Sequence, residues 1–427
     1  MTLPLTALLI VRNERENIEQ ALVSARQIAD QIVINDTGST DGTLEFLRAQ
    51  RDVLLLQNSW QDSFARARNQ ALEQALGQWI FWLDADDRLP QETIDLVNQL
   101  KTTTPDRLIG FEVVNRLRDS VEGGPRFLQI RMFPRLQGLC WEGTVHEQIE
   151  SSAQKLGLES IHYTVCIEHH GYSNPELNKK KALRNLPLIL ADQERLLSDP
   201  AFAASLGDAY YILEEWARGI ESYEQIKYIP EGLKKNADVY KEVPFWVGLG
   251  YFHLKDYKKA VLAFTAAIAE KPEKLEAYYH KAQCLEYLAQ LEEALVVWEK
   301  CLDLKRPLTG TLNRFDILRP QALRQAALLA IRLSGPCLEK AAWWAEQLLK
   351  EQPLAVEARH VMGKVQKARG RNDLAIKTWI EGLGLNPGAS VELLTDLLLE
   401  LAARPDLEPL LRSVMPLAHK YFPDHFK

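Results

Sequence analysis

The sequence predicts two domains of different class, an α/β domain with a mostly parallel sheet over residues 1–190 and an all-helical repeat domain over residues 191–427. Short apolar runs alternate with amphipathic helical segments through the first hundred residues, which is typical of a doubly wound sheet with helices on both faces. Strand signals stop beyond about residue 175. Small and large side chains then recur every 34 residues, as expected for stacked helical repeats.

Four strands are predicted in the first hundred residues: Thr6–Val11, Gln31–Asp36, Val53–Leu56 and Trp79–Leu83. Helical segments separate them, one opening near Ile18 and another covering residues 62–76. Because parallel strands are joined by such crossovers, their carboxyl ends meet at one sheet edge, where ligands bind. Polar clusters follow three of these strands, at residues 12–14, 36–42 and 84–87.

The next segment is predicted to add a hairpin. Strand patterns at Leu108–Val114 and Phe127–Phe133 flank a turn signal at Gly123-Gly124-Pro125. Four of the nine histidines lie between residues 146 and 170, so imidazole chemistry is expected there.

The helical half carries a period of 34 residues. Gly248, Tyr251, Ala260, Phe264, Ala267 and Pro272 recur, within one position, as Ala282, Leu285, Ala294, Trp298, Cys301 and Pro307. This spacing resembles the tetratricopeptide repeat, in which small residues let paired helices approach and large ones fill the gap between repeats. Residues 306–322 break the period and are predicted to form a loop or an irregular repeat. The tryptophans of this half are interpreted as packing residues.

Composition narrows the class of protein. The 427 residues include 51 basic and 58 acidic side chains, a net charge of −7, which argues against a general nucleic-acid binder. Five scattered cysteines without a CxxC spacing suggest reduced thiols in a cytoplasmic protein. No apolar run reaches the roughly 18 residues of a membrane helix, so no transmembrane segment is expected, and peripheral membrane attachment stays open.

A cation site is predicted where the strand Trp79–Leu83 runs into Asp84, Asp86 and Asp87. Carboxylates beside a core are costly unless a positive charge compensates them. On an extended backbone Asp84 and Asp86 point to one side, and two hard oxygen donors suit a divalent ion bound to phosphate. Asp87 is expected to face away and to cap the helix that begins near Pro90.

Four motifs in this order resemble a glycosyltransferase family 2 domain of the GT-A type: Leu9–Glu14, Asp36–Gly42, Ala67-Arg68-Asn69 and Leu83–Asp86. The later motifs Gly143–Glu147 and Ile167–Tyr172 resemble a subgroup that carries tetratricopeptide repeats after the transferase, including sublancin-type peptide S-glycosyltransferases.

The resemblance implies a UDP-sugar donor, a divalent metal (Mn²⁺ or Mg²⁺) and a single displacement with inversion. It assigns Asp84 and Asp86 to the acidic motif, with Asp86 as the direct ligand and Asp84 nearer the ribose or a bound water. His169 would complete the metal's ligands, and an imidazole favours manganese. The implied nucleotide-site residues are Asp36, which would read the uracil imide, Arg68, and Asn13 and Glu14, which would shape the base pocket.

The acceptor must lose a proton as it attacks, so a base is expected opposite the leaving group. Glu147 is the candidate base and His146 is the alternative. Two candidates remain because many family members have a Glu-Asp pair at this position, where this chain has His-Glu. Glu147 could instead hold its loop through a hydrogen bond. Structural alternatives also exist for the other residues: a solvated turn for Asp84 and Asp86, packing for His169, capping for Asp36, Asn13 and Glu14, and plain surface exposure for Arg68.

The predicted function is therefore transfer of a sugar from a UDP-sugar to a protein or peptide bound by the repeats, which would alternatively pair two copies of the chain. Two other hypotheses remain. One is an assembly scaffold whose transferase-like domain has lost catalysis, and the other is transfer to a polysaccharide or a lipid-linked glycan. The lysine run Lys179-Lys180-Lys181 is interpreted as an exposed helix start, with contact to a phosphate or an acidic acceptor as the alternative.

Overall fold

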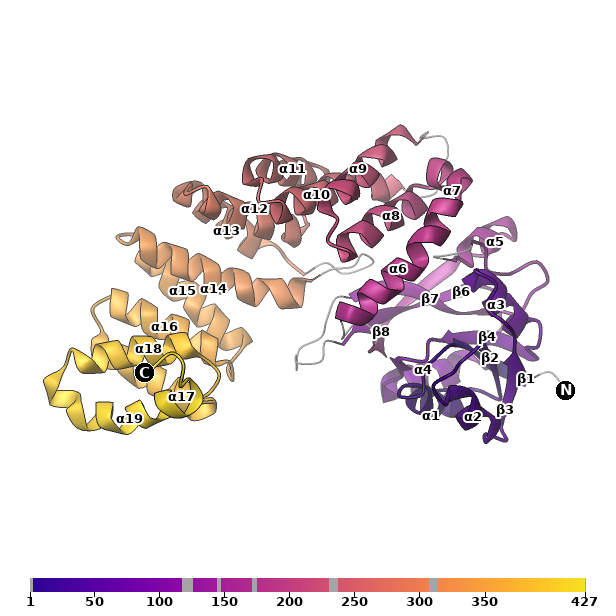
Figure 1. Cartoon of the computed structure of the whole chain (residues 1–427), viewed down its shortest axis with the longest axis horizontal. Coiled ribbons are helices and arrows are strands. Elements are labelled where there is room, and N and C mark those ends of the chain that lie inside the picture. The colour runs from indigo at the N-terminus through magenta and orange to yellow at the C-terminus, as the bar shows by residue number, and fades with distance from the viewer. Residues whose placement is uncertain are drawn as a thin grey trace. The chain divides into compact units, whose positions relative to one another are not determined.

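The computed structural model describes residues 3–116, 126–143, 147–170, 175–229, 237–306 and 314–426 (Figure 1). The chain divides into two compact units. The first comprises residues 1–254 and 307–314, and the second residues 255–306 and 315–427. The predicted domain boundary at residue 190 stays a prediction. No helix in the described part of the chain is both long and apolar enough to span a membrane.

The first unit contains an eight-stranded sheet in the order β3-β2-β1-β4-β7-β6-β8-β5. The strands are β1 Leu3–Val11, β2 Gln31–Asp36, β3 Val53–Gln57, β4 Gly77–Leu83, β5 Asp87–Arg88, β6 Leu108–Asn115, β7 Arg126–Pro134 and β8 Ser160–His169. The four predicted strands pair in parallel, which confirms the α/β pattern. The predicted hairpin strands β6 and β7 pair antiparallel, and β7 lies between β4 and β6 inside the sheet. The turn predicted at residues 123–125 lies outside the described residues.

Side chains alternate between two cores on the two faces of the sheet. In β4, Trp79, Phe81 and Leu83 join a core with α1 and α4, whereas Ile80 and Trp82 join a second core with α3. The helices of this part are α1 Ile18–Ile28, α2 Thr43–Arg48, α3 Phe64–Leu72, α4 Gln91–Leu100 and α5 Glu150–Lys155. Because β4 is buried on both faces, it reads in the sequence as a continuous apolar run.

The sheet brings four chain segments to one edge. Strand β8 is parallel to β6, which is antiparallel to β7, which is antiparallel to β4. Strand β8 therefore runs in the same direction as β1, β2 and β4, and its carboxyl end lies at the edge where theirs end. The two-residue strand β5 follows β4 in the chain but pairs with β8, with Asp87 opposite His169.

Helices continue the first unit beyond the sheet: α6 Pro175–Ala191, α7 Gln193–Ser198, α8 Pro200–Ile212, α9 Trp216–Gln225 and α10 Ala237–His253. Helices α8 and α9 pack as a repeat pair. A Cβ added at Gly207 of α8 would lie 2.5 Å from the ring of Tyr223 in α9, so only glycine allows this approach. This close approach agrees with the predicted role of small residues.

The second unit consists of helices: α11 Tyr257–Glu270, α12 Leu275–Tyr287, α13 Leu291–Asp303, α14 Phe315–Leu333, α15 Cys337–Glu351, α16 Val356–Ala368, α17 Asn372–Leu385, α18 Val391–Ala402 and α19 Glu408–Tyr421. Trp298, Trp344 and Trp379 are buried between them, as the packing interpretation predicts, whereas Trp343 is about half exposed. Of the two expectations for residues 306–322, the loop is wrong from Phe315 onward, because the 19-residue helix α14 begins there and contains Pro320; the irregular repeat stays a prediction. Residues 307–313 lie outside the described part.

Candidate functional site

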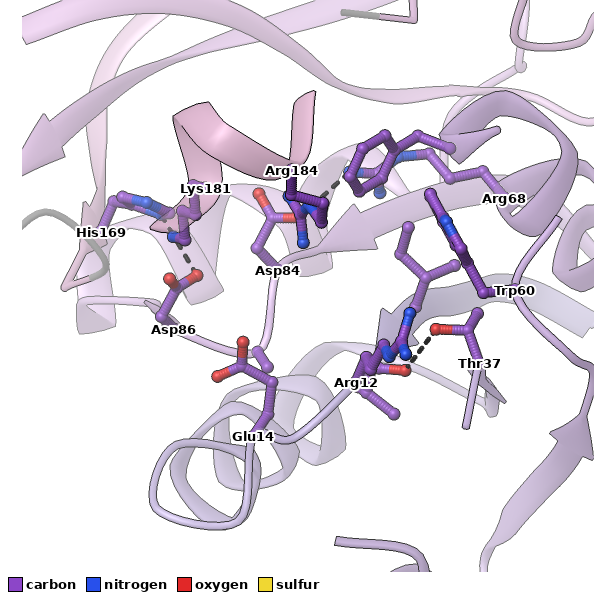
Figure 2. A pocket seen from close by; sticks show the side chains of 14 residues that line it. Arg12, Glu14, Thr37, Trp60, Arg68, Asp84, Asp86, His169, Lys181 and Arg184 are labelled. Atoms are coloured by element: carbon purple, nitrogen blue, oxygen red, sulfur yellow. Dashed lines mark hydrogen bonds and ion pairs between the residues drawn. The ribbon is translucent and has the colours of Figure 1, made fainter. Parts of the chain in front are cut away.

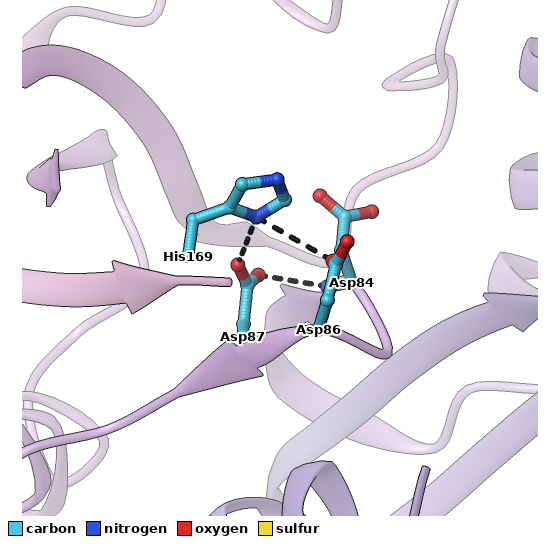
Figure 3. Close-up of side chains that lie close together, drawn as sticks. All are labelled: Asp84, Asp86, Asp87 and His169. Carbon is cyan, nitrogen blue, oxygen red and sulfur yellow. Dashed lines mark hydrogen bonds and ion pairs between the residues drawn. The ribbon is translucent and has the colours of Figure 1, made fainter. Parts of the chain in front are cut away.

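Three carboxylates and one imidazole meet at the carboxyl edge of the sheet. Asp84, Asp86, Asp87 and His169 each place a ligand atom within 4.8 Å of the others (Figure 3). Nδ1 of His169 lies 2.8 Å from Oδ1 of Asp87 and 3.4 Å from Oδ1 of Asp86. The structure therefore brings together the three residues predicted as metal ligands and adds Asp87.

The prediction that Asp87 faces away and caps α4 is wrong. It assumed an extended backbone, but Asp84–Asp87 forms a turn in which the amide of Asp87 donates to the carbonyl of Asp84 at 3.1 Å. Asp87 is fully buried, and the N-cap of α4 is Pro90, without a side-chain hydrogen bond. The turn and the β5–β8 pairing direct Asp87 toward His169 instead.

Two arginines hold the Asp84 carboxylate. Nη2 of Arg68 lies 3.1 Å from its Oδ1, and Nη2 of Arg131 lies 3.4 Å from its Oδ2. Both guanidinium groups lie over the ring of Trp82, at 4.0 and 3.8 Å from its centroid. Burial alone would raise the pKa of Asp84, but the charges of Arg68 and Arg131 lower it well below its ordinary value. Asp84 therefore stays ionised.

The pKa values of Asp86 and His169 are both raised, for different reasons. Burial raises the pKa of Asp86, and the negative charges of Asp84 and Asp87 raise it further against the opposing effect of His169. Burial disfavours protonation of His169, yet its hydrogen bond to the Asp87 carboxylate and the surrounding carboxylates raise its pKa above the ordinary value. The raised pKa values of Asp86 and His169 reflect an excess of negative charge in the cluster, which a bound cation would offset.

A cavity of about 250 Å³ opens beside the cluster (Figure 2). Of the predicted site residues, it is lined by Glu14, Arg68, Asp84, Asp86 and His169. The other lining side chains are Ile10, Val11, Arg12, Thr37, Trp60, Phe64, Ala85, Lys181 and Arg184. Asn13, Asp36 and Glu147 are not among the lining residues.

Asp36 ends β2 and is 2% exposed. Its Oδ1 accepts hydrogen bonds from the amides of Gly38 and Ser39, each at 2.8 Å, so the predicted alternative of a turn cap describes this oxygen. Its Oδ2 is buried and has no hydrogen-bond partner in the described part of the chain. A buried acceptor without a partner is unusual in a folded protein and leaves one carboxylate oxygen for a ligand donor.

Asn13 and Glu14 build the loop that follows β1. Asn13 adopts a left-handed backbone (φ 59°), and its Oδ1 accepts from the amide of Thr40 at 2.7 Å. Oε2 of Glu14 accepts a hydrogen bond from Nδ2 of Asn17 at 2.9 Å. Glu14 also lines the cavity, and burial raises the pKa of its carboxyl group. Asn13 therefore ties two loops together, while Glu14 contributes a carboxyl group to the cavity wall.

Glu147 is tied to the cluster through Arg68. Its Oε1 accepts from Nε of Arg68 at 2.6 Å, and the same guanidinium contacts Asp84. Arg68 is buried, and the charges of Glu147 and Asp84 raise its pKa against the effect of burial. The expectation of a plain surface residue for Arg68 is thus excluded. His146, the alternative base, lies outside the described residues.

Several lining residues have no predicted role in the site, or only an alternative one. Arg12 stands inside the recognised Leu9–Glu14 motif and was given no role. Lys181 was interpreted as part of an exposed lysine run, and Arg184 lies three residues further along α6. Their spacing on one helical face was the available signal. Trp60 and Phe64, whose rings meet edge to face at 4.8 Å, follow no motif.

The donor set fits a divalent cation. Clustered carboxylates with one imidazole suit an ion that accepts oxygen and nitrogen donors, such as Mn²⁺. Asp86 and His169 are the best placed, because both oxygens of Asp84 already contact arginines and Asp87 is engaged by Arg131 at 2.7 Å.

Two parts of the chain match known protein families, and several known proteins are similar to it. Residues 6–153 match the model of glycosyl transferase family 2, and residues 241–301 match that of anaphase-promoting complex subunit 3. A TPR repeat-containing protein of Synechococcus elongatus is 32% identical over 181 residues, which cover 40% of this chain and 43% of that protein. The SPbeta prophage-derived glycosyltransferase SunS of Bacillus subtilis is 28% identical over 245 residues, covering 56% and 54%.

Further relatives are similar to only one part of the chain. The lipopolysaccharide core biosynthesis glycosyltransferase LpsC of Rhizobium meliloti is 33% identical over 118 residues, 27% of this chain and 43% of LpsC. Among solved structures, the TPR protein YrrB is 15% identical and covers 49% of this chain and 96% of its own, with a TM-score of 0.38. The chain spans about half the length of the first two curated relatives.

Proposed function

Because residues 6–153 form a glycosyltransferase family 2 domain, followed by tetratricopeptide-type helices, we propose that this protein transfers a sugar from a UDP-sugar to an acceptor with the help of a divalent cation. The observation that carries the proposal is the Asp84–Asp86–Asp87–His169 cluster at the wall of a cavity. The predicted GT-A-type α/β class and the helical repeat class agree with both the structure and the family matches.

The residues at the carboxyl edge of the sheet have separate roles in the proposed reaction. Asp36 offers Oδ2, which has no hydrogen-bond partner among the described residues, to the uracil imide N–H, and Glu14 and Asn13 shape the loop beside it. Asp86 and His169, with Asp84, hold the cation. When bound, that cation supplies positive charge to the departing diphosphate. Arg68 and Arg131 keep Asp84 ionised and fixed, which preorganises the site before the donor binds.

The acceptor-side base in this proposal is Glu147, with His146 as the alternative. The acceptor attacks the anomeric carbon, its proton passes to the base, and the bond to the diphosphate breaks, which gives inversion in one step. Glu147 is linked to the cation cluster through the Arg68 guanidinium, which contacts both Glu147 and Asp84, and this link supports a role for Glu147 beside the site.

Binding and turnover of the donor test the proposal. Wild-type protein is expected to bind UDP in the presence of Mn²⁺ and to hydrolyse or transfer a UDP-sugar, and a chelator should abolish both. Asp86→Ala is expected to lose this activity while circular dichroism shows an intact fold. Full activity of Asp86→Ala in a chelator would contradict metal dependence. Absence of any metal-dependent UDP binding by the wild type would favour the inactive scaffold.

The acceptor is proposed to be a protein or peptide held by the repeats, because TPR-type helices are surfaces for protein interaction. A glycan acceptor is the second candidate, supported by the similarity to LpsC, whose name places it in lipopolysaccharide core biosynthesis. Mass spectrometry of proteins from cells with and without the gene decides between them, since only protein glycosylation adds a hexose mass to a peptide. Pairing of two copies and a cytoplasmic location belong to the same proposal.

A further inference from the structure

Helix α6 contributes two cations to the cavity although it lies beyond the family match, which ends at residue 153. Lys181 and Arg184 are three residues apart, so they share one helical face, and both line the cavity (Figure 2). Their neighbours Lys179 and Lys180 do not line it. Lys179 pairs with Glu214 at 2.8 Å, and Lys180 is exposed.

The orientation of Arg184 is set by an aromatic ring. Its guanidinium lies 5.1 Å from the centroid of Phe64, which itself lines the cavity. A hydrogen bond from its Nε to Asn185 at 3.0 Å is compatible with this position. Arg184 has no carboxylate within 4 Å among the described residues, so its charge is not neutralised by an ion pair there.

A third cation faces Arg184 from the end of β1. Arg12 lines the same cavity, and both arginine side chains keep an exposed fraction. Desolvation at the cavity wall, followed by the charge of Arg12, lowers the pKa of Arg184. Two guanidinium groups that repel each other across a cavity would both be stabilised by an anion between them.

The cavity lining also carries negative charge, from Glu14, Asp84 and Asp86. Lys181 offsets part of the rise in pKa that burial causes at Asp86 and at Glu14, so its ammonium lies within electrostatic reach of both. Asp84 is already compensated by Arg68 and Arg131. A ligand that matches the charges of this cavity therefore presents phosphate oxygens to Lys181, Arg184 and Arg12, and a cation held by Asp86 and His169 would contact the same phosphates.

We propose that Lys181 and Arg184, together with Arg12, bind the diphosphate group of the nucleotide donor, so that helix α6 completes the donor site. This inference rests on the proposed function. It assigns to these residues two effects, donor affinity and stabilisation of the charge on the departing nucleoside diphosphate.

Isothermal titration calorimetry with uridine, UMP and UDP in saturating Mn²⁺ tests the proposal. Lys181→Ala and Arg184→Ala are each expected to weaken UDP binding roughly tenfold or more, since hydrogen bonds to charged groups are lost. Uridine binding should stay unchanged, because the nucleoside carries no phosphate. Lys180→Ala removes the same charge from the adjacent exposed position and is expected to bind UDP like the wild type.

Two outcomes overturn the inference alone. One is a wild type that binds UDP with metal while Lys181→Ala and Arg184→Ala bind it equally well. The other is an equal loss in Lys180→Ala, which would assign the effect to general surface charge. A wild type that binds neither UDP nor UMP overturns the proposed function as well, so the two failures are distinguishable. Circular dichroism of each variant confirms that a loss of binding does not come from unfolding.

Discussion

Asp87 and His169 lie opposite each other on β5 and β8, and Nδ1 of the imidazole is 2.8 Å from the buried carboxylate. Because Asp87 also contacts Arg131 and the amide of Asp84, its position is fixed from three sides. A carboxylate that accepts a hydrogen bond from Nδ1 fixes the orientation of the ring. Figure 3 shows that the second nitrogen of the ring points away from Asp87.

Asp87→Asn is expected to weaken Mn²⁺ binding about 10- to 100-fold, because the ionised acceptor that orients His169 is lost. The same change leaves the guanidinium of Arg131, 1% exposed, without its closest carboxylate, so the free energy of unfolding should fall by a few kcal/mol. Metal titration and urea unfolding measure the two effects.

Glu168→Gln is the matched control for that experiment. Glu168 precedes His169 in β8, but its carboxylate pairs with Arg116. We expect near wild-type metal affinity. Equal affinity in Asp87→Asn and the wild type would show that Asp87 does not position the imidazole.

Glu147→Gln separates the two roles of Glu147. If it removes the acceptor proton, transfer should fall by roughly 10²- to 10⁴-fold while UDP affinity is kept. If it only holds Arg68, the guanidinium loses its 2.6 Å partner and UDP binding should fall together with transfer. We expect the first result. Glu142→Gln, which alters an exposed pair with Lys155, serves as the control on the same loop.

Asp396 is expected to stabilise the second unit in a pH-dependent way. Burial opposes its ionisation, but hydrogen bonds from His360 and Lys364, at 2.7 and 3.0 Å, lower its pKa below the ordinary value of 3.8. A carboxyl group with a lower pKa in the folded state contributes stability above its unfolded pKa, and the contribution is lost as the pH falls through the folded pKa.

Asp396→Asn should therefore reduce the free energy of unfolding by about 1 kcal/mol at pH 7, with the difference shrinking below about pH 4. Urea unfolding at both pH values measures it. Asp373→Asn, which changes an exposed pair with Arg404, should have little effect at either pH. A difference for Asp396→Asn that is independent of pH would contradict the ionic origin.

The close approach of α16 and α17 can be tested with one methyl group. A Cβ at Gly363 would lie 2.1 Å from Nε1 of the buried Trp379, so Gly363→Ala should destabilise the protein by about 1–3 kcal/mol. Gly384 of α17 has no atom within 4 Å of its added Cβ, and Gly384→Ala should be neutral or stabilising. Thermal unfolding compares them, and equal effects would exclude a steric cause.

Local pattern predicted most of the fold and part of the site. The apolar runs of β1, β2 and β4 and the polar residues after them are contiguous in sequence, so Asp36, Asp84 and Asp86 could be assigned to one sheet edge. The 34-residue period likewise predicted the close helix pairs, because each contact lies within a repeat or its neighbour.

The pairing of strands that lie far apart in the chain could not be predicted from the sequence. Nothing near Asp87 indicates a two-residue strand that pairs with a segment 82 positions later, and an extended backbone was the default for an acidic run after a strand. Arg184 carries no sequence signal of its own, and phosphate contact by the lysine run was only an alternative, since only the position of α6 distinguishes Lys181 from Lys179 and Lys180. The partnerless oxygen of Asp36 also depends on its three-dimensional surroundings.

The place of β8 in the sheet has a consequence for protein engineering. The family match ends at residue 153, whereas β8 spans residues 160–169 and is paired on both sides, to β6 and to β5. A truncated or chimeric transferase cut at the end of the match would lose this strand, expose the backbone edge of β6 and promote aggregation. A fusion junction placed after Ala191, where α6 ends, retains the strand, His169 and both cations of α6.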